Sequence, residues 1–175
     1  MQSEQSLHHL PRENRQTVER EVVRRRQYSV PVDVQAIAED LGINVWSWDM
    51  GPDVSGMLAR QSPPDGGRSG YAIYVNNQHH PNRMRFTIAH EIAHFILHRD
   101  ESPDTIRDDQ FYRALSNPLE AEANRLAAEI LMPWHLVNEL TSQGVTSLDE
   151  LASRMQVSKQ AMAIRLGIPY DQTWE

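Results

Sequence analysis

Hydrophobic side chains recur at helical spacing in some stretches of the chain and alternate with polar ones in others. Residues 31–41 carry an apolar residue every three or four positions, and Gly42 follows where a left-handed helix cap is expected. Residues 43–48, 54–60 and 70–76 are shorter and read as strands, the clearest of them by their alternation. The first half of the chain is therefore expected to hold a helix and a three-stranded antiparallel sheet.

The most continuous apolar stretch spans residues 85–98, and Asn82 stands where it can cap a helix. A helix that is apolar on nearly every side is buried. His90, Glu91 and His94 interrupt this one with polar side chains. Because buried polar groups need partners, the stretch predicts a buried helix that carries a polar site.

A second amphipathic helix is predicted over residues 118–132. Pro118 suits the first turn of a helix, Asn117 or Ser116 can cap it, and Pro133 ends it. Six apolar residues share one face and are expected to be buried: Leu119, Ala123, Leu126, Ala127, Ile130 and Leu131.

Near the N-terminus, residues 11–27 are predicted to form a charged helix. Its apolar stripe is thin and consists of Val18, Val22 and Val23. Three arginines at positions 24–26 suit the negative end of the helix dipole, although such a run can also contact nucleic acid or an acidic partner. We expect a solvated helix end there, and we expect residues 1–10 to lie outside the fold.

After Pro133, the chain is predicted to form three short helices, at residues 134–140, 147–155 and 159–166. The last two resemble a helix-turn-helix, with Gln156 where the turn often carries glycine. The last helix has two cationic residues, Lys159 and Arg165. Two are few for a DNA-binding helix, because several phosphate contacts usually supply the affinity for DNA. We expect this tail to pack on the core or to dock a protein, and we expect no DNA binding.

Composition narrows the class of protein further. The chain has 175 residues, no cysteine and a formal net charge of −7. A chain without cysteine forms no disulfides, which suits a reducing cytoplasm. We find no apolar run near the roughly 20 residues of a membrane span and no secretory leader, so we expect a cytoplasmic protein without membrane contact. Its acidic balance suits a basic protein partner better than nucleic acid.

The spacing His90-Glu91-x-x-His94 is typical of a metal-dependent peptidase. Side chains four residues apart lie on one face of a helix, so the two imidazoles can bind one ion. Glu91 lies beside them and can act as the general base on a water molecule. The alternative is a buried helix whose histidines only bind backbone groups, and the spacing favours the metal.

A catalytic zinc ion needs a third protein ligand and one open position. Glu120 and Asn124 share a face of the second helix, so a carboxylate can bind the ion while the amide orients a ligand histidine. Glu122 lies far round that helix and is expected to face water, which makes Glu120 the preferred ligand. His98, one turn after His94, would close the open position as a fourth ligand, so we expect it beside the ligands or at the helix end.

Together these motifs resemble the ImmA/IrrE family of metallo-endopeptidases. The resemblance rests on two runs, Arg85-Phe-Thr-Ile-Ala-His-Glu-Ile-Ala-His94 and Glu120-x-Glu-Ala-Asn124-x-x-Ala-Ala-x-x-Leu131-Met-Pro133. It implies a small zincin with Glu120 as the third ligand and a cytosolic protein as the substrate. In this family the substrate is often a helix-turn-helix repressor of phage, mobile-element, toxin–antitoxin or stress-response circuits.

The expected fold is α+β and has three parts. Residues 1–29 form the charged helix, and residues 30–133 form a zincin-like peptidase core around the three-stranded antiparallel sheet. Residues 134–175 form a helix-turn-helix-like helical module packed on that core. In such folds a sheet edge beside the metal helix holds an extended peptide by strand addition. The oligomeric state is left open.

The predicted function is a zinc-dependent endopeptidase, with a helix-turn-helix repressor as the implied substrate. Zn²⁺ is the default ion, while Mn²⁺ or Fe²⁺ fit the same set of two nitrogens and one oxygen. Tyr71 and Tyr74 are both candidates for stabilising the oxyanion, and the sequence does not choose between them. The alternative function is a non-catalytic, metal-containing regulator that binds a repressor or DNA through its C-terminal helices.

Overall fold

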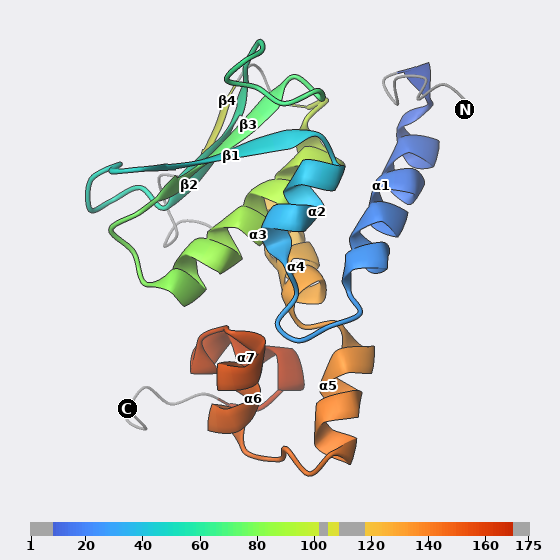
Figure 1. The fold of residues 1–175 in the computed structure, drawn as a ribbon, viewed down its shortest axis with the longest axis vertical. Coiled ribbons are helices and arrows are strands. Elements are labelled where there is room, and N and C mark those ends of the chain that lie inside the picture. Colours follow the sequence, from blue (N-terminus) through green and yellow to red (C-terminus); the bar gives the residue numbers. More distant parts are fainter. Residues whose placement is uncertain (1–8, 102–104, 109–117, 170–175) are drawn as a thin grey trace.

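The computed structural model describes residues 9–101, 105–108 and 118–169. A sheet lies at one end of the molecule with helices packed beneath it, and the last three helices lie at the opposite end (Figure 1). The elements are α1 (Arg12–Arg26), α2 (Val34–Asp40), β1 (Ile43–Trp48), β2 (Gly56–Arg60), β3 (Tyr71–Asn76), α3 (Pro81–His98), β4 (Thr105–Asp108), α4 (Pro118–Leu131), α5 (Trp134–Ser142), α6 (Leu148–Met155) and α7 (Lys159–Leu166).

Within the described residues, the sheet is mixed and has four strands in the order β1-β3-β2-β4. β1 runs parallel to β3, whereas β2 runs antiparallel to both β3 and β4. The three predicted strands are present, and β2 is antiparallel to β3 as expected. The purely antiparallel sheet of three strands is wrong, because β1 is parallel to β3 and β4 adds a fourth strand. Sequential strands often pair as hairpins, but here β2 lies on the far side of β3 and leaves β1 parallel to it.

The fourth strand, β4, lies outside the three stretches that the sequence pattern predicts to be strands. It pairs with residues 56–59 of β2. Four residues carry little local signal, so the free edge of β2 decides this strand rather than its own sequence. Residues 102–104 and 109–117, which include the candidate helix caps Ser116 and Asn117, lie outside the described residues.

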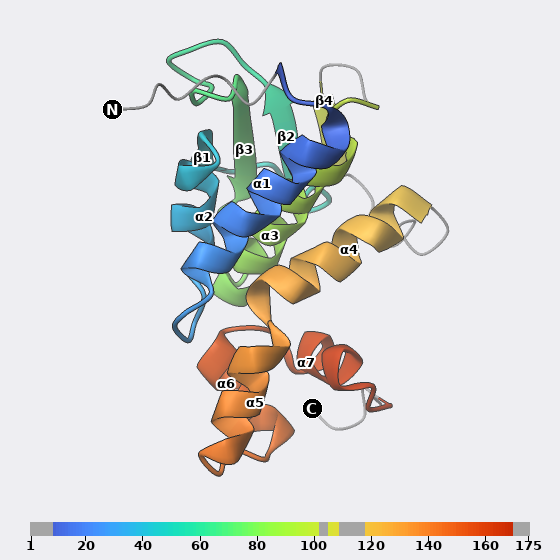
Figure 2. The ribbon, with the colours of Figure 1, turned by 90° about the vertical axis from the view of Figure 1, so that its right-hand side faces the viewer.

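The helix α3 packs against one face of the sheet (Figure 2). Every residue from 87 to 98 is buried. His80 caps it, because its Nδ1 accepts a hydrogen bond from the backbone N–H of Asn82 at 3.1 Å. The predicted cap at Asn82 is therefore wrong by two residues. Pro81 explains the difference, since proline favours the first helical position and keeps the preceding residue extended.

Gly56, at the start of β2, allows the sheet and α3 to approach closely. A Cβ atom at this position would lie 2.5 Å from Cγ2 of Thr87 and 2.8 Å from the carbonyl oxygen of Tyr74. Both distances are far below van der Waals contact, so glycine is required where the strand meets the helix. This contact sets the position of α3 just before the turn that carries His90.

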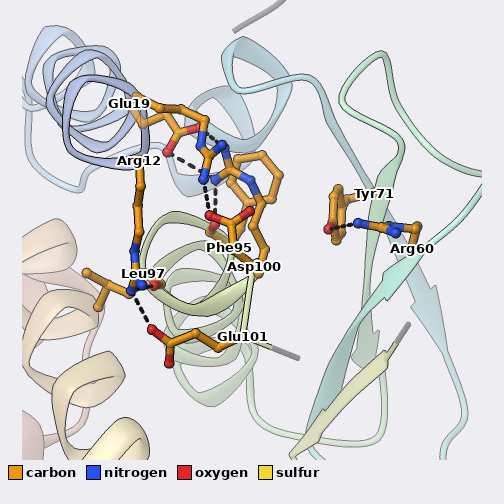
Figure 3. A network of polar contacts seen from close by, with 10 residues as sticks. Arg12, Glu19, Arg60, Tyr71, Phe95, Leu97, Asp100 and Glu101 are labelled. Atoms are coloured by element: carbon orange, nitrogen blue, oxygen red, sulfur yellow. Dashed lines mark hydrogen bonds and ion pairs between the residues drawn. The ribbon is translucent and has the colours of Figure 1, made fainter. Parts of the chain in front are cut away.

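The inward face of α1 is largely charged. Arg15, Glu19 and Val23 are buried, whereas Val18 is exposed and Val22 is only half-buried. The expected valine stripe is therefore wrong except at Val23. Hydropathy does not reveal the true face, because its polar members pair with charged residues around the end of α3, as the network in Figure 3 shows.

Arg99 directly follows α3 and is bound by the carboxylate of Glu19. Its Nη1 and Nη2 donate to the two carboxylate oxygens at 3.0 and 2.5 Å, and Nη1 also donates to the carbonyl oxygen of Phe95 at 2.5 Å. Burial raises the pKa of Glu19 even against the hydrogen bonds and charge of Arg99. The pair is therefore costly to desolvate, and its clearest effect is to attach α1 to the end of α3.

The other helices follow the predicted pattern closely. α2 buries Val34, Ile37 and Ala38, and Gly42 has the left-handed backbone of the expected cap, with a φ of 77°. The predicted stripe of α4 is buried except for Leu119, which is 40% exposed because it lies in the first turn, before the helix meets the core. No helix in the described ranges is long and apolar enough to span a membrane.

The C-terminal helices contact the start of α3. Asn82 Nδ2 donates to the carbonyl oxygen of Val157, and Arg85 Nε donates to that of Gln156, both at 3.3 Å. Gln156 has a φ of 52°, so it adopts the left-handed conformation that glycine often supplies in such a turn. Whether α6 and α7 act as a helix-turn-helix stays a prediction.

Glu19→Ala should lower the free energy of unfolding by about 3–5 kcal/mol, because it leaves the buried Arg99 without its partner. Glu21→Ala is the matched control on the solvent side of α1, and it should change stability by no more than about 0.5 kcal/mol. Denaturant unfolding of both variants measures the difference. Small and equal effects would show that the Glu19–Arg99 pair does not hold α1 in place.

Candidate metal centre

The packing of α4 against α3 brings the three predicted ligands together. The Nε2 atoms of His90 and His94 lie 3.0 Å apart. Glu120, in the first turn of α4, places Oε2 at 3.1 Å from Nε2 of His90 and Oε1 at 3.1 Å from Nε2 of His94. Two residues from one helix and one from another therefore converge on a single point.

These donor atoms fit a zinc ion. A tetrahedral zinc ion with bonds near 2.05 Å separates its ligand atoms by about 3.4 Å. The two imidazole nitrogens, 3.0 Å apart, need to open by only a few tenths of an ångström, and a carboxylate oxygen of Glu120 lies within 4.8 Å of both of them. Two imidazoles and one carboxylate also leave one tetrahedral position open, as a catalytic ion requires.

The protonation states in this group also suit a metal. Burial alone would raise the pKa of Glu120, but the hydrogen bonds from His90 and His94 outweigh burial and lower it. Burial lowers the pKa of His94, despite the opposing hydrogen bond from Glu120. The group therefore presents an anionic oxygen and a neutral imidazole at neutral pH, and these are the forms that bind metal ions.

Glu91 follows His90 on α3 and is completely buried. Its carboxylate is not among the three converging ligand atoms. A carboxylate next to the ligands but outside their group has the position that a general base needs. The catalytic role of Glu91 stays a prediction.

The two candidate tyrosines lie on opposite faces of β3, because side chains alternate along a strand. Tyr71 faces α3, where its ring packs edge-on against Phe95 with centroids 5.3 Å apart (Figure 3). Its hydroxyl accepts a hydrogen bond from Nη2 of Arg60 at 3.2 Å. Tyr74 projects from the other face and is half-buried. These contacts do not involve the three ligands, so the choice of oxyanion stabiliser stays open.

The surroundings of the ligands include contacts that the sequence did not indicate. The Oδ1 atom of Asn124 is buried without a hydrogen bond in the described part of the chain, and its role in orienting a ligand histidine stays a prediction. Nδ1 of His94 lies 3.0 Å from Nδ1 of His98, whose Nε2 lies 3.0 Å from Oε2 of Glu122. Sequence reasoning missed Glu122 as a partner, since it placed this side chain in water. The side chain is 49% exposed, yet its carboxylate reaches α3.

A sheet packed on a buried helix, with two histidines and a glutamate converging from two helices, fits the zincin class of metallopeptidases. Comparison with known families narrows this class. Residues 38–167 match the peptidase family described as the IrrE N-terminal-like domain, and the chain belongs to this family. The match covers most of the chain, including both helices that supply the three converging side chains.

Two curated relatives are radiation response metalloproteases IrrE. The one from Deinococcus deserti is 38% identical over 92 residues, which cover 50% of this chain and 33% of the relative. The one from Deinococcus radiodurans is 40% identical over 90 residues, which cover 49% of this chain and 27% of the relative. The chain thus matches a third or less of the length of these relatives.

A Mycobacterium tuberculosis transcriptional regulator of known structure shares the fold. The two structures superpose with a TM-score of 0.52, over 92% of this chain and 52% of the other. The sequences are 17% identical, so this likeness concerns the fold alone.

Glu120→Ala should abolish stoichiometric zinc binding, because it removes one of three ligands. Glu122→Ala, two residues along the same helix, should still bind one ion per chain when zinc is saturating. Metal analysis after dialysis against buffers of fixed free zinc distinguishes the two variants. Loss of the bound ion in both variants, or in neither, would contradict the assignment of Glu120.

Proposed function

We propose that this chain is a zinc-dependent endopeptidase that hydrolyses a peptide bond in a protein substrate. The observation that carries the proposal is the convergence of His90, His94 and Glu120, whose ligand atoms lie within 4.8 Å of one another. Membership of a peptidase family supports it independently. Mn²⁺ and Fe²⁺ are compatible with the same donor set.

A bound zinc ion would supply Lewis-acid chemistry, polarising the scissile carbonyl and lowering the pKa of the attacking water to about 7. His90, His94 and Glu120 would hold that ion and leave one position for substrate. Glu91 accepts a proton from the attacking water and returns it to the leaving amine. Because Glu91 belongs to the same buried helix as both histidines, its carboxylate is held at a constant place relative to them.

An extended substrate would add to the free edge of β4. This strand ends the sheet and pairs with β2 in the described part of the chain. Figures 1 and 2 place β4 and α4 on one side of α3, with β1 and α2 on the other. A peptide paired with β4 would therefore run past the side of α3 from which Glu120 approaches.

The substrate class that fits best is a cytosolic helix-turn-helix repressor. The chain carries a net charge of −7, which favours association with a basic protein. Both relatives are named for a radiation response, which supports a substrate that regulates a stress response. A folded DNA-binding protein would offer both the basic surface and a peptide segment for the sheet edge.

The alternative is a non-catalytic regulator that binds DNA through α7. Its two cations already have partners within the chain. Nζ of Lys159 lies 3.0 Å from a carboxylate oxygen of Asp149. Arg165 donates to the carbonyl oxygen of Met132 at 2.9 Å and lies over the ring of Trp134. Few charges remain on α7 to contact phosphates, so this alternative has less support.

The chain should show no specific DNA binding at about 150 mM salt, since phosphate contacts supply most of the affinity of such proteins. Footprinting on the region upstream of its own gene is the measurement. A protected site that disappears in the double variant Lys159→Ala, Arg165→Ala would favour the regulator instead.

Glu91→Gln should reduce cleavage of the substrate by roughly 10²–10⁴-fold, because the amide keeps the size of the side chain but cannot accept the proton. Zinc content and fold should stay as in the wild type. The measurement is cleavage of a co-incubated helix-turn-helix repressor, encoded next to this gene, followed on gels with metal analysis of the same samples.

Glu129→Gln, an exposed substitution on α4, is the matched control and should cleave at the wild-type rate. A chelator should stop cleavage by the wild type, and added Zn²⁺ should restore it. If fully metallated wild type binds the repressor without cutting it, the peptidase proposal fails. If Glu91→Gln cuts as fast as wild type, the role given to Glu91 is wrong.

A further inference from the structure

We propose that His98 and Glu122 form a hydrogen-bonded support for His94, and that this support sets the affinity of the centre for its metal ion. Both would be positioning residues, since neither belongs to the group of converging ligand atoms. The inference rests on the proposed metal centre, and it concerns how tightly that centre holds an ion.

The support is a continuous chain of contacts that leads away from the ligand group. Nδ1 of His94 lies 3.0 Å from Nδ1 of His98, and Nε2 of His98 lies 3.0 Å from Oε2 of Glu122. The side chains of His94 and His98 are each only 3% exposed, whereas that of Glu122 is 49% exposed. The chain thus runs from the buried ligand to a carboxylate at the surface.

The direction of each hydrogen bond follows from the ligand role of His94. Its Nε2 faces His90 and Glu120, so when an ion is bound Nε2 supplies the lone pair and Nδ1 carries the proton. Nδ1 of His98 then accepts the hydrogen bond that the Nδ1–H group of His94 donates. A neutral His98 consequently carries its own proton on Nε2, from which it donates to Glu122.

This arrangement would fix both the tautomer and the orientation of His94. A ligand histidine usually donates its second ring N–H to a carboxylate or carbonyl group, and loss of that partner weakens metal binding. Here His98 stands between the ligand and the carboxylate. The charge of Glu122 favours the proton on Nε2 of His98 and therefore leaves Nδ1 free to accept.

The position of Glu122 also links the support to the docking of α4. Glu120 and Glu122 are two residues apart at the start of this helix. Glu120 contacts His94 and Glu122 contacts His98, one turn further along α3. A single approach of α4 to α3 therefore places the third ligand and completes the support for the second.

A role for His98 as a fourth ligand fits the contacts less well. Both of its ring nitrogens already have partners. Its Nδ1 faces Nδ1 of His94, the ring nitrogen of His94 that lies away from the other ligands. The competing explanation is purely structural: a buried hydrogen-bonded pair that stabilises the fold and leaves metal affinity unchanged.

The test is the zinc dissociation constant of the full chain, measured without substrate by competition with a chromophoric chelator. Glu122→Ala should raise it by about 10-fold and His98→Ala by about 10–100-fold, with one ion per chain at saturation in both. Glu122→Gln should raise the dissociation constant less than Glu122→Ala, because the amide oxygen still accepts a hydrogen bond from His98. Glu129→Ala, exposed on the same helix, is the control and should match the wild type.

A double-mutant cycle separates the support from two independent effects. Adding Glu122→Ala to His98→Ala should have almost no further effect on the dissociation constant, since Glu122 acts through His98. Additive effects, or wild-type affinity in both single variants, would overturn the inference. Thermal unfolding of the metal-free proteins checks the fold, and if His98→Ala does not fold, the comparison of Glu122→Ala with Glu122→Gln decides.

The outcomes also distinguish this inference from the proposed function. If the wild type binds no metal, both the proposed metal centre and its proposed support are refuted. If the wild type binds zinc and cleaves its substrate while the Glu122 and His98 variants keep full affinity, this inference alone fails.

Discussion

The burial of two imidazoles side by side on one helix is the constraint on which the rest of this structure depends. His90 and His94 are each no more than 3% exposed, and Glu91 between them is completely buried. Polar groups in such surroundings cost free energy unless they are paired. Glu120 pairs with both histidines from a different helix, so α4 cannot slide along α3 without leaving them unsatisfied. The requirement that makes the group suitable for a metal thus also fixes the packing of two helices.

The same helix is held at both ends by polar contacts from distant parts of the chain. At its start, Asn82 and Arg85 donate to the backbone between α6 and α7. Beyond its end, Arg99 is bound by Glu19 of α1. The sheet supports the part between, where Gly56 leaves room for the side chain of Thr87. A centre whose ligands must stay within a few tenths of an ångström benefits from such a rigid helix.

Sequence reasoning succeeded where the signal was local. Helical periodicity located α2, α3 and α4 to within a few residues, and the His-Glu-x-x-His spacing identified the face of α3 that meets Glu120. It failed where the partner was remote. The inward face of α1 contains Arg15 and Glu19, which hydropathy treats as exposed, because their partners at the end of α3 are about 80 residues away.

The sequence by itself determined which side chains share a helix face, because that depends only on the 3.6-residue period of the backbone. It therefore determined that His90, His94 and His98 lie along one side of α3 and that Glu120 begins an amphipathic helix. Only the tertiary structure decided the strand order, the fourth strand and the contact of Glu122 with His98. Each of these depends on which faces of distant segments meet, and the free energy of that choice comes from packing and pairing across the whole fold rather than from neighbouring residues.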